Sequence, residues 1–326
     1  MNILRRYFEE PDRMDAQEQI VNAVTANPLY FLNQYTKDPR TFEGRYINSD
    51  LMKEIFPMYR ASKESRNYYN LPVHNASAVL AAQQFFSIIQ DRSKAEQIIM
   101  HFVTGTPGSG KTTIIQEDNE LPHKVRGVYE GQLIDESAIL KIKLSLEMGF
   151  RPRISVVHTT PELALDNTIN RFNLIGRGAS VALIAKILGD LPEGLQKIFK
   201  CFGEKVALDI SDHRDLSNTK ILEGWEHLNV LQSEGTNERI KTKLYEYLES
   251  IRGNISAECY AQAAGRPPVL GRRNQQRASG VAGESRSQLQ ADGRRSEISR
   301  GTIQDGLLTA LPAPMMSIAH YFDRYR

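Results

Sequence analysis

Cysteine is scarce in this sequence, and long apolar runs are missing. Cys201 and Cys259 are the only cysteines, and they neither require an oxidising compartment nor supply a cysteine-based metal site. No run of about 18 apolar residues occurs, so no membrane span is expected. Arg5 and Arg6 place charges where a secretory signal needs its apolar region. We therefore expect a cytoplasmic, reduced protein without a membrane partner.

An excess of charge of one sign is also lacking. The formal net charge is +2, which gives no overall signature of nucleic-acid or membrane binding. Apolar residues make up 40% and charged residues 25% of the chain, as in ordinary soluble proteins. The 326 residues suffice for one sizeable core, or one core with smaller appendages. Composition thus predicts a soluble globular protein and leaves its function open.

The sequence does contain a candidate phosphate-binding loop. Residues 105–112 read Gly105-Thr106-Pro107-Gly108-Ser109-Gly110-Lys111-Thr112 and fit the pattern G-x-x-x-x-G-K-[ST]. The apolar run 98–103 before them predicts a buried parallel strand, and residues 112–115 open a helix. A glycine-rich turn that only resembles the motif is the less favoured interpretation, because the pattern stands in register between a strand and a helix.

Each residue type in this loop has a chemical reason. Glycines let consecutive backbone N–H groups turn inward around a phosphate. Lys111 is predicted to reach the β- and γ-phosphates, and Thr112 to offer its hydroxyl to Mg²⁺. We therefore expect a nucleoside triphosphate, ATP or GTP, to bind with Mg²⁺ at residues 105–113, which end with Thr113.

Strand and helix patterns alternate around the loop. Strands are predicted over residues 44–50, 98–103, 124–131, 153–158 and 205–211. Helices are predicted from Leu51 to Pro57, over 74–86, 135–148 and 181–188, and after Thr160, which can cap its helix. This alternation implies an α/β fold of the P-loop kinase type, with a mostly parallel sheet and helices on both faces.

Four segments are predicted along the chain. Residues 1–40 form helices interrupted at Pro11 and Pro28, residues 41–235 form the P-loop kinase domain, and residues 236–260 form a C-terminal helix. Residues 261–326 form a mostly disordered, basic tail. Its part 261–300 holds eight arginines against Glu284, Asp292 and Glu297. A solvated tail is preferred there over binding of nucleic acid or an acidic partner, which stays possible.

Two carboxylates stand at the ends of predicted strands. Asp50 follows one strand, and carboxylates at that end point into the crevice where open α/β sheets bind ligands. An equal alternative is that Ser49 or Asp50 only caps the next helix. Glu130 ends another strand and can accept hydrogen bonds from sugar hydroxyls. Its alternative role is that of an ATPase acid that binds Mg²⁺ or orients water, but the four-apolar-then-Asp pattern of such enzymes is missing, which favours a kinase.

Two arginines are candidates for neutralising charge on a transferring phosphoryl group. Arg171 and Arg177 flank Gly176, and arginines at such a helix end suit a lid that closes over phosphates. The alternative is a pair of solvated surface arginines.

These residues together resemble the zeta-toxin family, the P-loop kinases of bacterial toxin–antitoxin systems. The likeness covers about residues 44–215 and includes Ile47-Asn48-Ser49-Asp50 followed by Pro57-Met58-Tyr59, the loop from Pro107 to Thr112, Glu130-Gly131, and Arg171 with Gly176-Arg177. The resemblance implies that Asp50 is the catalytic base and that Glu130 contacts substrate. It also implies that Arg171 and Arg177 bind phosphate.

The order of these motifs departs from the family. Asp50 precedes the loop here, whereas the family places its aspartate after the loop. Only 18 residues separate Lys111 from Glu130, too few for a further strand and helix. We therefore expect a circularly permuted arrangement, in which the Asp50 strand comes first in the chain but fills the same place in the sheet.

The family resemblance also implies a function. It implies a Mg²⁺-dependent kinase that transfers the γ-phosphoryl of ATP or GTP to a hydroxyl of a nucleotide sugar such as UDP-N-acetylglucosamine, held inactive by a small antitoxin. Two alternatives remain. One is a nucleic-acid or nucleotide kinase or binder that uses the basic tail, and the other is a regulatory P-loop NTPase without an acceptor.

Overall fold

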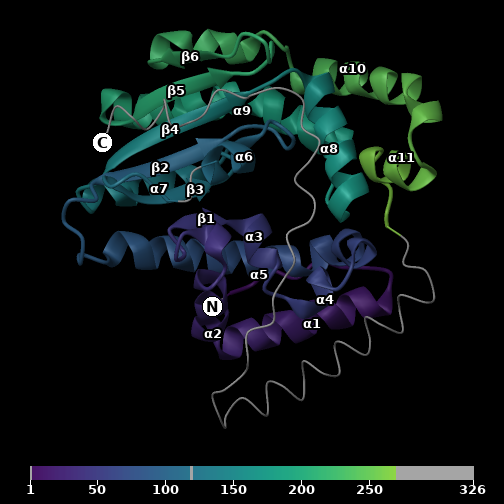
Figure 1. Cartoon of the computed structure of the whole chain (residues 1–326), viewed down its shortest axis with the longest axis horizontal. Helices are drawn as coiled ribbons and strands as arrows, with labels where there is room; N and C mark the ends of the chain where they lie inside the picture. The colour runs from purple at the N-terminus through teal and green to yellow at the C-terminus, as the bar shows by residue number, and fades with distance from the viewer. Residues whose placement is uncertain (1, 118–119, 269–326) are drawn as a thin grey trace.

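The centre of the protein is a six-stranded sheet. A computed structural model describes residues 2–117 and 120–268. The strands are β1 (Tyr46–Asn48), β2 (Ile99–Thr104), β3 (Val125–Glu130), β4 (Arg151–His158), β5 (Ala207–Asp212) and β6 (Lys220–Glu223). Their order in the sheet is β1-β3-β2-β4-β5-β6 (Figure 1). The first five are parallel and β6 is antiparallel to β5, which confirms the predicted α/β fold.

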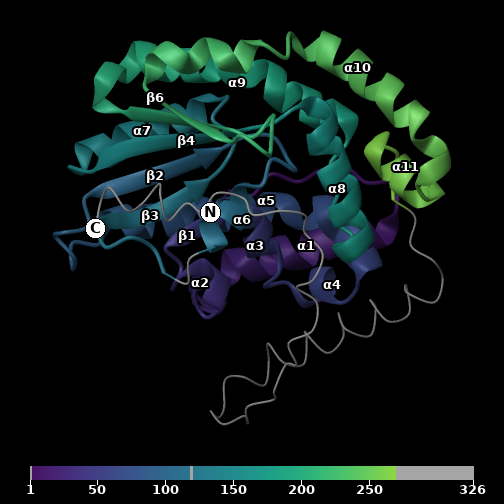
Figure 2. The ribbon, with the colours of Figure 1, turned by 45° about the horizontal axis from the view of Figure 1, so that its top comes forward.

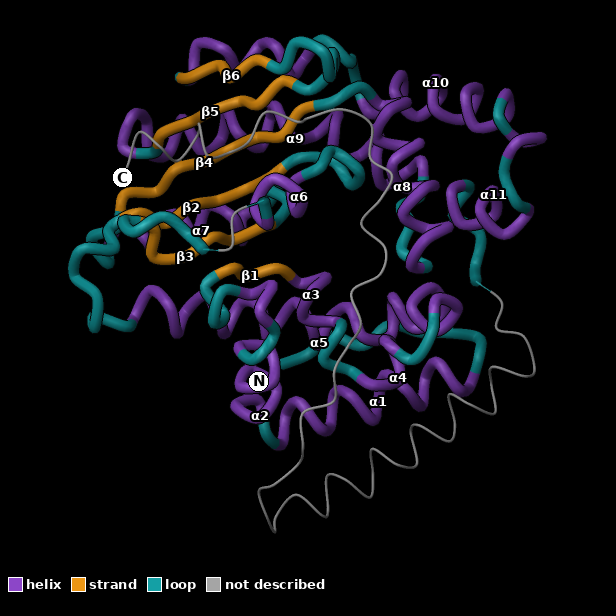
Figure 3. The backbone as a smooth tube through the Cα atoms, in the orientation of Figure 1, coloured by secondary structure: helices purple, strands orange, loops and turns teal. Residues whose placement is uncertain are grey.

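Helices surround this sheet (Figures 2 and 3). The α-helices of the described residues are α1 (Pro11–Ala26), α2 (Pro28–Thr36), α3 (Ser49–Lys53), α4 (Pro57–Arg60), α5 (Lys63–Gln90), α6 (Lys111–Gln116), α7 (Glu136–Glu147), α8 (Pro161–Ile175), α9 (Val181–Phe202), α10 (Asn237–Ser250) and α11 (Ala257–Ala263). Short 3₁₀ turns are η1 (Pro39–Thr41), η2 (Gly203–Lys205), η3 (Trp225–Gln232) and η4 (Arg252–Asn254). Figure 1 shows α1, α2 and α5 beside the β1 edge and α10 next to α8. Within the described residues, no helix is long and apolar enough to span a membrane.

Both faces of the sheet are buried. Successive side chains of a strand point to opposite faces, and in β2 every side chain from Met100 to Thr104 is buried. Phe102 on β2 and Tyr129 on β3 are register partners, and both rings pack against Phe85 of α5. The continuous apolar runs that predicted these strands therefore reflect cover on both faces.

Prolines begin some helices and lie inside others. Pro11 and Pro28 stand at the first turns of α1 and α2, where proline is preferred because its missing N–H needs no partner. The prediction of two short N-terminal helices is confirmed. Pro57 likewise starts α4, whereas the sequence predicted only that it ends a helix.

The helix predicted over residues 181–188 is longer than expected. Helix α9 continues through Pro192 to Phe202, although an internal proline removes one backbone hydrogen bond. Leu195 and Ile198 are buried beyond the proline, and their packing outweighs that loss. In the same way, α5 begins at Lys63, well before residue 74, and passes through Pro72.

A second apolar cluster joins the last helices to α8 and α9. It is formed by Ala164, Leu165, Ile169, Phe172, Ala179, Val181, Ile184, Ala185, Leu188, Ile240, Leu244, Leu248, Cys259 and Ala263. Helix α11 therefore packs as part of the protein and extends past residue 261, where the predicted tail begins. The tail from residue 269 onward lies outside the described residues.

Tyr35 connects the N-terminal helices to the edge strand. Its side chain, on α2, is fully buried. Its hydroxyl donates to the carbonyl oxygen of Tyr46 at 2.6 Å and accepts from the backbone N–H of Asn48 at 3.0 Å. Burial raises the pKa of this phenol, so the hydroxyl keeps its proton and remains a donor. Helix α2 thus holds β1 from the side that has no neighbouring strand.

Removal of this hydroxyl is expected to destabilise the protein. Tyr35→Phe leaves the buried N–H of Asn48 without its acceptor, which costs about 1–3 kcal/mol. Urea unfolding measures the difference. The matched control is Tyr245→Phe, because the hydroxyl of that half-buried tyrosine makes no hydrogen bond within residues 2–117 and 120–268. An equal decrease in the free energy of unfolding in the two variants would contradict the role given to Tyr35.

Candidate active site

The loop between β2 and α6 has a backbone that only glycine fits at three positions. Gly105, Gly108 and Gly110 have φ angles of +141°, +83° and +95°, a region that favours glycine. A Cβ atom on Gly105 would meet the carbonyl oxygen of Val157, and one on Gly108 would meet that of Ala164. The loop therefore packs closely against β4 and α8, and Gly105 and Gly108 are required by space as well as by conformation.

Lys111 lies inside this loop. Its Nζ donates to the carbonyl oxygens of Gly105 and Thr106, each at 2.8 Å, and its side chain is 11% exposed. Burial lowers the pKa of Lys111, while the nearby carboxylate of Glu130 raises it in part. The loop therefore holds a cation directed at its own backbone, where a bound phosphate would need one.

The carboxylate of Glu130 meets the loop from the next strand. It accepts from the hydroxyl of Tyr46, from Nδ2 of Asn48 at 2.7 Å and from Oγ1 of Thr112 at 3.3 Å. Nζ of Lys111 lies 4.0 Å away. One acidic side chain thus gathers donors from the edge strand and from the loop.

Strand register explains this meeting. Asn48 and Glu130 are Cα partners between β1 and β3, and Val103 pairs with Glu130 between β2 and β3. The carboxyl ends of these parallel strands therefore lie at one edge of the sheet, where ligands bind in open α/β folds. The expectation that the strand before Asp50 joins the sheet although it precedes the loop is confirmed.

Asn48, and not Ser49 or Asp50, caps the helix that follows. Its Oδ1 accepts from the backbone N–H groups of Asp50 at 2.7 Å and Leu51 at 3.2 Å. Helix α3 accordingly begins at Ser49 and not at Leu51. This corrects the capping alternative of the sequence analysis, and it leaves the carboxylate of Asp50 available for other contacts.

Asp50 is bound by two cations, the buried Lys53 and the partly buried Arg177. One carboxylate oxygen lies 2.6 Å from a guanidinium nitrogen of Arg177, and the other lies 2.9 Å from Nζ of Lys53. The side chain of Asp50 is 40% exposed, against 16% for Arg177 and 4% for Lys53. Burial raises the pKa of Asp50, but Arg177 and Lys53 outweigh it and hold the pKa well below its usual range.

The end of α8 and the loop after it carry the two predicted arginines, of which Arg177 pairs with this carboxylate. Gly176 ends the helix with a φ of +76°, and a Cβ atom there would meet the carbonyl oxygen of Lys63. Nε of Arg171 donates to the carbonyl oxygen of Arg177 at 3.0 Å. Burial lowers the pKa of Arg177, but the carboxylate of Asp50 reverses this and raises it. Both arginines therefore belong to one cluster and are not solvated surface residues.

The two groups of residues form one electrostatic site. Burial and the charge of Arg177 lower the pKa of Arg171, and the carboxylates of Asp50 and Glu130 act on it in the opposite direction. Arg171 and Asp50 likewise act on the pKa of Lys111. The residues proposed from sequence as catalytic or substrate-binding are thus brought together.

Several residues of the site were missed by the sequence reasoning. Tyr46 and Asn48 hold Glu130, and Lys53 holds Asp50 while also donating to Oδ1 of Asn70 at 2.7 Å. The spacing of Lys53, three residues after Asp50 on a helix, is a signal that was available. The contacts of Asn48 depend on strand register, which a three-residue strand does not reveal.

The donor set fits Mg²⁺. Within residues 2–117 and 120–268 no group of three or more His, Cys, Asp or Glu side chains is arranged to hold a metal ion. Mg²⁺ in phosphoryl-transfer sites uses one or two protein oxygens and takes its other ligands from water and phosphates. The hydroxyl of Thr112 beside the carboxylate of Glu130 supplies such a pair of oxygens.

Comparisons with known proteins give only weak likenesses. No protein-family model matches the chain, and no curated protein matches it in sequence. One similar solved structure is the AvrRxo1-ORF1:AvrRxo1-ORF2 complex in native form, with 10% identity and a TM-score of 0.36 over 62% of this chain and 83% of the other. Another is AvrRxo1-ORF1:AvrRxo1-ORF2 with sulphate ions, with 11% identity and a TM-score of 0.41 over 85% and 90%. These values are low, and the function proposed below is inferred from the residues of the site.

The Asp50 ion pairs predict a pH-dependent contribution to stability. Asp50→Asn is expected to be less stable than the wild type at neutral pH, because Lys53 and Arg177 lose their counter-charge. The folded pKa of Asp50 is depressed, so this contribution is complete above the unfolded value of about 3.9 and disappears as the pH falls through the folded value. Urea unfolding of both proteins from neutral pH to about pH 2 measures their free energies of unfolding, and the difference between the two should become smaller as the pH falls.

The control for this measurement is an exposed ion pair. Asp190 pairs with Lys186 on the surface of α9, and exposed pairs contribute about 0–1 kcal/mol. Asp190→Asn should therefore change little at any pH. A stability difference for Asp50→Asn that stayed constant down to the lowest pH would contradict a native-state ion pair.

Proposed function

We propose that this protein is a P-loop kinase that transfers the γ-phosphoryl group of ATP or GTP to a hydroxyl of a small nucleotide-type acceptor, with a nucleotide sugar such as UDP-N-acetylglucosamine as the leading candidate. The observation that carries the proposal is the placement of a cation-bound carboxylate, Asp50, two residues after Asn48, whose side chain binds Glu130 beside the phosphate loop. In a nucleotide-hydrolysing module the same carboxylate would orient water instead of an acceptor hydroxyl, and the transfer assay below distinguishes the two functions. The nucleotide-sugar acceptor follows from the zeta-toxin resemblance.

The loop residues bind and orient the nucleotide. Backbone N–H groups around Gly108 and Gly110 surround the phosphates, and Lys111 turns from the loop carbonyls to the phosphate oxygens. Thr112 and Glu130 hold Mg²⁺, which neutralises charge on the phosphates when it is bound. We thus assign Glu130 to the metal side of the site, because its carboxylate lies beside the Thr112 hydroxyl.

Asp50 orients the acceptor hydroxyl and takes its proton. Its depressed pKa keeps the carboxylate ionised at neutral pH, which makes it a weak base before the reaction. Phosphoryl transfer tolerates this, because bonding to the attacking oxygen is slight in the transition state and positioning contributes more than basicity. Lys53 and Arg177 fix the carboxylate so that its oxygens keep one direction.

The arginines complete the charge balance. Lys53, Lys111, Arg171 and Arg177 outnumber the two carboxylates of the site. Arg171 lies near the end of α8 and Arg177 in the loop that follows, and Arg171 donates to the carbonyl oxygen of Arg177. Guanidinium groups bind phosphoryl oxygens with several parallel donors, so this pair is suited to charge that spreads over the transferring group.

The direct test is phosphoryl transfer. With γ-³²P-labelled ATP, Mg²⁺ and a pool of bacterial metabolites, followed by purified UDP-N-acetylglucosamine, the wild type should form a labelled acceptor. Lys111→Ala should lower that rate about 10²–10³-fold, and Asp50→Asn about 10²–10⁴-fold. The matched control is Lys200→Ala. Lys200 is an exposed lysine in the last turn of α9, whereas Arg177 of the site precedes the first turn of that helix.

Two results would overturn the proposal in different ways. Label that appears only as free phosphate, equally in wild type and Asp50→Asn, would identify a P-loop NTPase without an acceptor. Transfer to a different class of hydroxyl would keep the kinase and exclude the nucleotide-sugar acceptor.

Glu130 has a separate kinetic signature. Glu130→Gln keeps the size of the side chain but removes its charge, so the Mg²⁺ concentration for half-maximal rate should rise about 10–100-fold. Thr112→Ala should shift the same quantity, since both residues bind the ion. Titrations with Mg²⁺ at saturating ATP measure this. An unchanged Mg²⁺ requirement with a raised acceptor KM would instead assign Glu130 to the substrate.

A further inference from the structure

A cavity of about 560 Å³ lies outside the phosphate loop, between α2, η1 and the α3–α4 segment. Its volume is within the range of about 300–1,000 Å³ typical of small-molecule sites. Its lining residues are Tyr30, Phe31, Gln34, Lys37, Asp38, Arg40, Glu54, Ile55, Pro57, Arg60 and Arg66. None of these belongs to the loop, and half of them come from the N-terminal segment that precedes the region of zeta-toxin resemblance.

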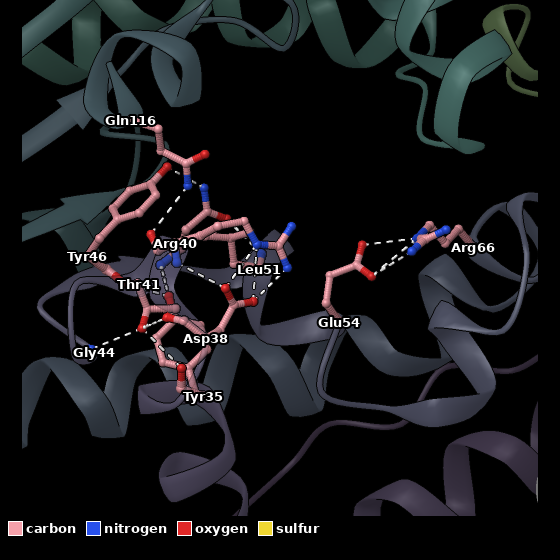
Figure 4. Close-up of polar contacts among 11 residues, drawn as sticks. Tyr35, Asp38, Arg40, Thr41, Gly44, Tyr46, Leu51, Glu54, Arg66 and Gln116 are labelled. Atoms are coloured by element: carbon pink, nitrogen blue, oxygen red, sulfur yellow. Dashed lines mark hydrogen bonds and ion pairs between the residues drawn. The ribbon is translucent and has the colours of Figure 1, made fainter. Parts of the chain in front are cut away.

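The charges of this cavity are unbalanced toward positive. Four of its lining residues are cations and two are carboxylates. Both carboxylates are already bound, Asp38 by Arg40 at 2.6 Å and Glu54 by Arg66 at 3.0 Å. Figure 4 shows these two pairs, with the guanidinium groups held by their carboxylates. These ion pairs fix the orientation of the guanidinium groups of Arg40 and Arg66. Their remaining N–H donors are therefore suited to bind an anion.

The other two of these four cations do not pair with a carboxylate of the described residues. Lys37 and Arg60 are exposed, and neither makes an ion pair with any residue that the structure describes. They come from separate segments, the end of α2 and the end of α4. Two unshared cations facing one cavity are the observation that points to an anionic ligand.

The other wall of the cavity is less polar. Tyr30 and Phe31 contribute aromatic rings whose centroids lie 5.3 Å apart, and Ile55 and Pro57 add aliphatic surface. Phosphate-bearing compounds with a base or sugar present this combination of anionic and flat or apolar parts. A free inorganic anion would leave the apolar wall without a partner.

The cavity adjoins the carboxylate that we assign to the acceptor. Asp50 and Glu54 lie four residues apart on and just beyond α3, about one helical turn. Glu54 also acts on the pKa of Arg177, and Arg177 on that of Arg40. On the other side, Nε2 of Gln116 on α6 donates to the carbonyl oxygen of Arg40 at 3.3 Å. The cavity therefore lies next to the site and contacts the helix of the phosphate loop.

We propose that this cavity binds the diphosphate of a nucleoside diphosphate-type acceptor, with Lys37 and Arg60 as the main charge contacts and the acceptor hydroxyl placed at Asp50. The inference rests on the proposed kinase function and adds to it the subsite of the acceptor. It gives the N-terminal helices a part in substrate binding.

The test needs no phosphoryl transfer. Inorganic pyrophosphate is titrated calorimetrically into the full chain, which has been saturated with Mg²⁺ and a non-hydrolysable ATP analogue to fill the loop. Binding is expected to persist, and Arg60→Ala and Lys37→Ala should each weaken it about tenfold or more. The matched control is Arg151→Ala, an exposed arginine at the start of β4, at the opposite end of the strands. Its affinity for pyrophosphate should equal that of the wild type.

The outcomes separate this inference from the function on which it rests. Equal pyrophosphate affinity in Arg60→Ala, Lys37→Ala and the wild type, or loss of binding once the loop is filled, would overturn the cavity as a diphosphate site. Absence of transfer with unchanged cavity binding would overturn the kinase alone.

A second measurement decides whether the bound diphosphate belongs to the acceptor. In transfer assays, pyrophosphate at saturating ATP should inhibit competitively against the acceptor. Inhibition independent of acceptor concentration would place the diphosphate of another, regulatory ligand in the cavity and overturn the acceptor assignment.

Discussion

The rest of the site depends on the hydrogen bonds that the partly buried carboxylate of Glu130 accepts. Its side chain is 14% exposed, and a carboxylate at that depth is tolerated only when donors or cations surround it. Those partners come from two distant parts of the chain, Tyr46 and Asn48 on the edge strand and Thr112 on the loop helix. Because these donors share one acceptor, the positions of the edge strand and the phosphate loop are fixed relative to each other. The residues that directly follow the edge strand are positioned in the same way.

The edge strand leads directly into α3, which presents Asp50 in its first turn. Asn48 binds Glu130 through its amide nitrogen and caps α3 through its amide oxygen, so one side chain sets both the position of β1 and the start of the helix that presents Asp50. The ion pair with Arg177 then extends the chain of contacts to the loop after α8. Truncating Asn48 would remove one donor to the Glu130 carboxylate and the cap of α3 together, which couples the geometry of the proposed base to that of the nucleotide loop.

Sequence reasoning succeeded where structure is local. The phosphate loop is a consecutive motif whose glycines the fold requires, and β2 to β5 are apolar because both their faces are covered. It failed where contacts depend on register or exposure. Strand β6 is exposed along most of its length and has no apolar pattern to mark it. The donors to Glu130 follow from the pairing of β1 with β3, and the capping role of Asn48 was ascribed to its neighbours because several residues there are competent caps.

The N-terminal helices stabilise the edge strand β1, which precedes the phosphate loop in the chain. Strand β1 has three residues and a strand partner on one side only, which is too little to fix its position by backbone pairing alone. Tyr35 on α2 supplies the missing contacts, and α5 packs against β1 and β3. The same helix α2 lines the basic cavity through Tyr30 and Phe31. Helix α2 therefore helps to set the position of the proposed base and forms a wall of the adjoining cavity. We expect stability and acceptor recognition to change together when α2 is altered.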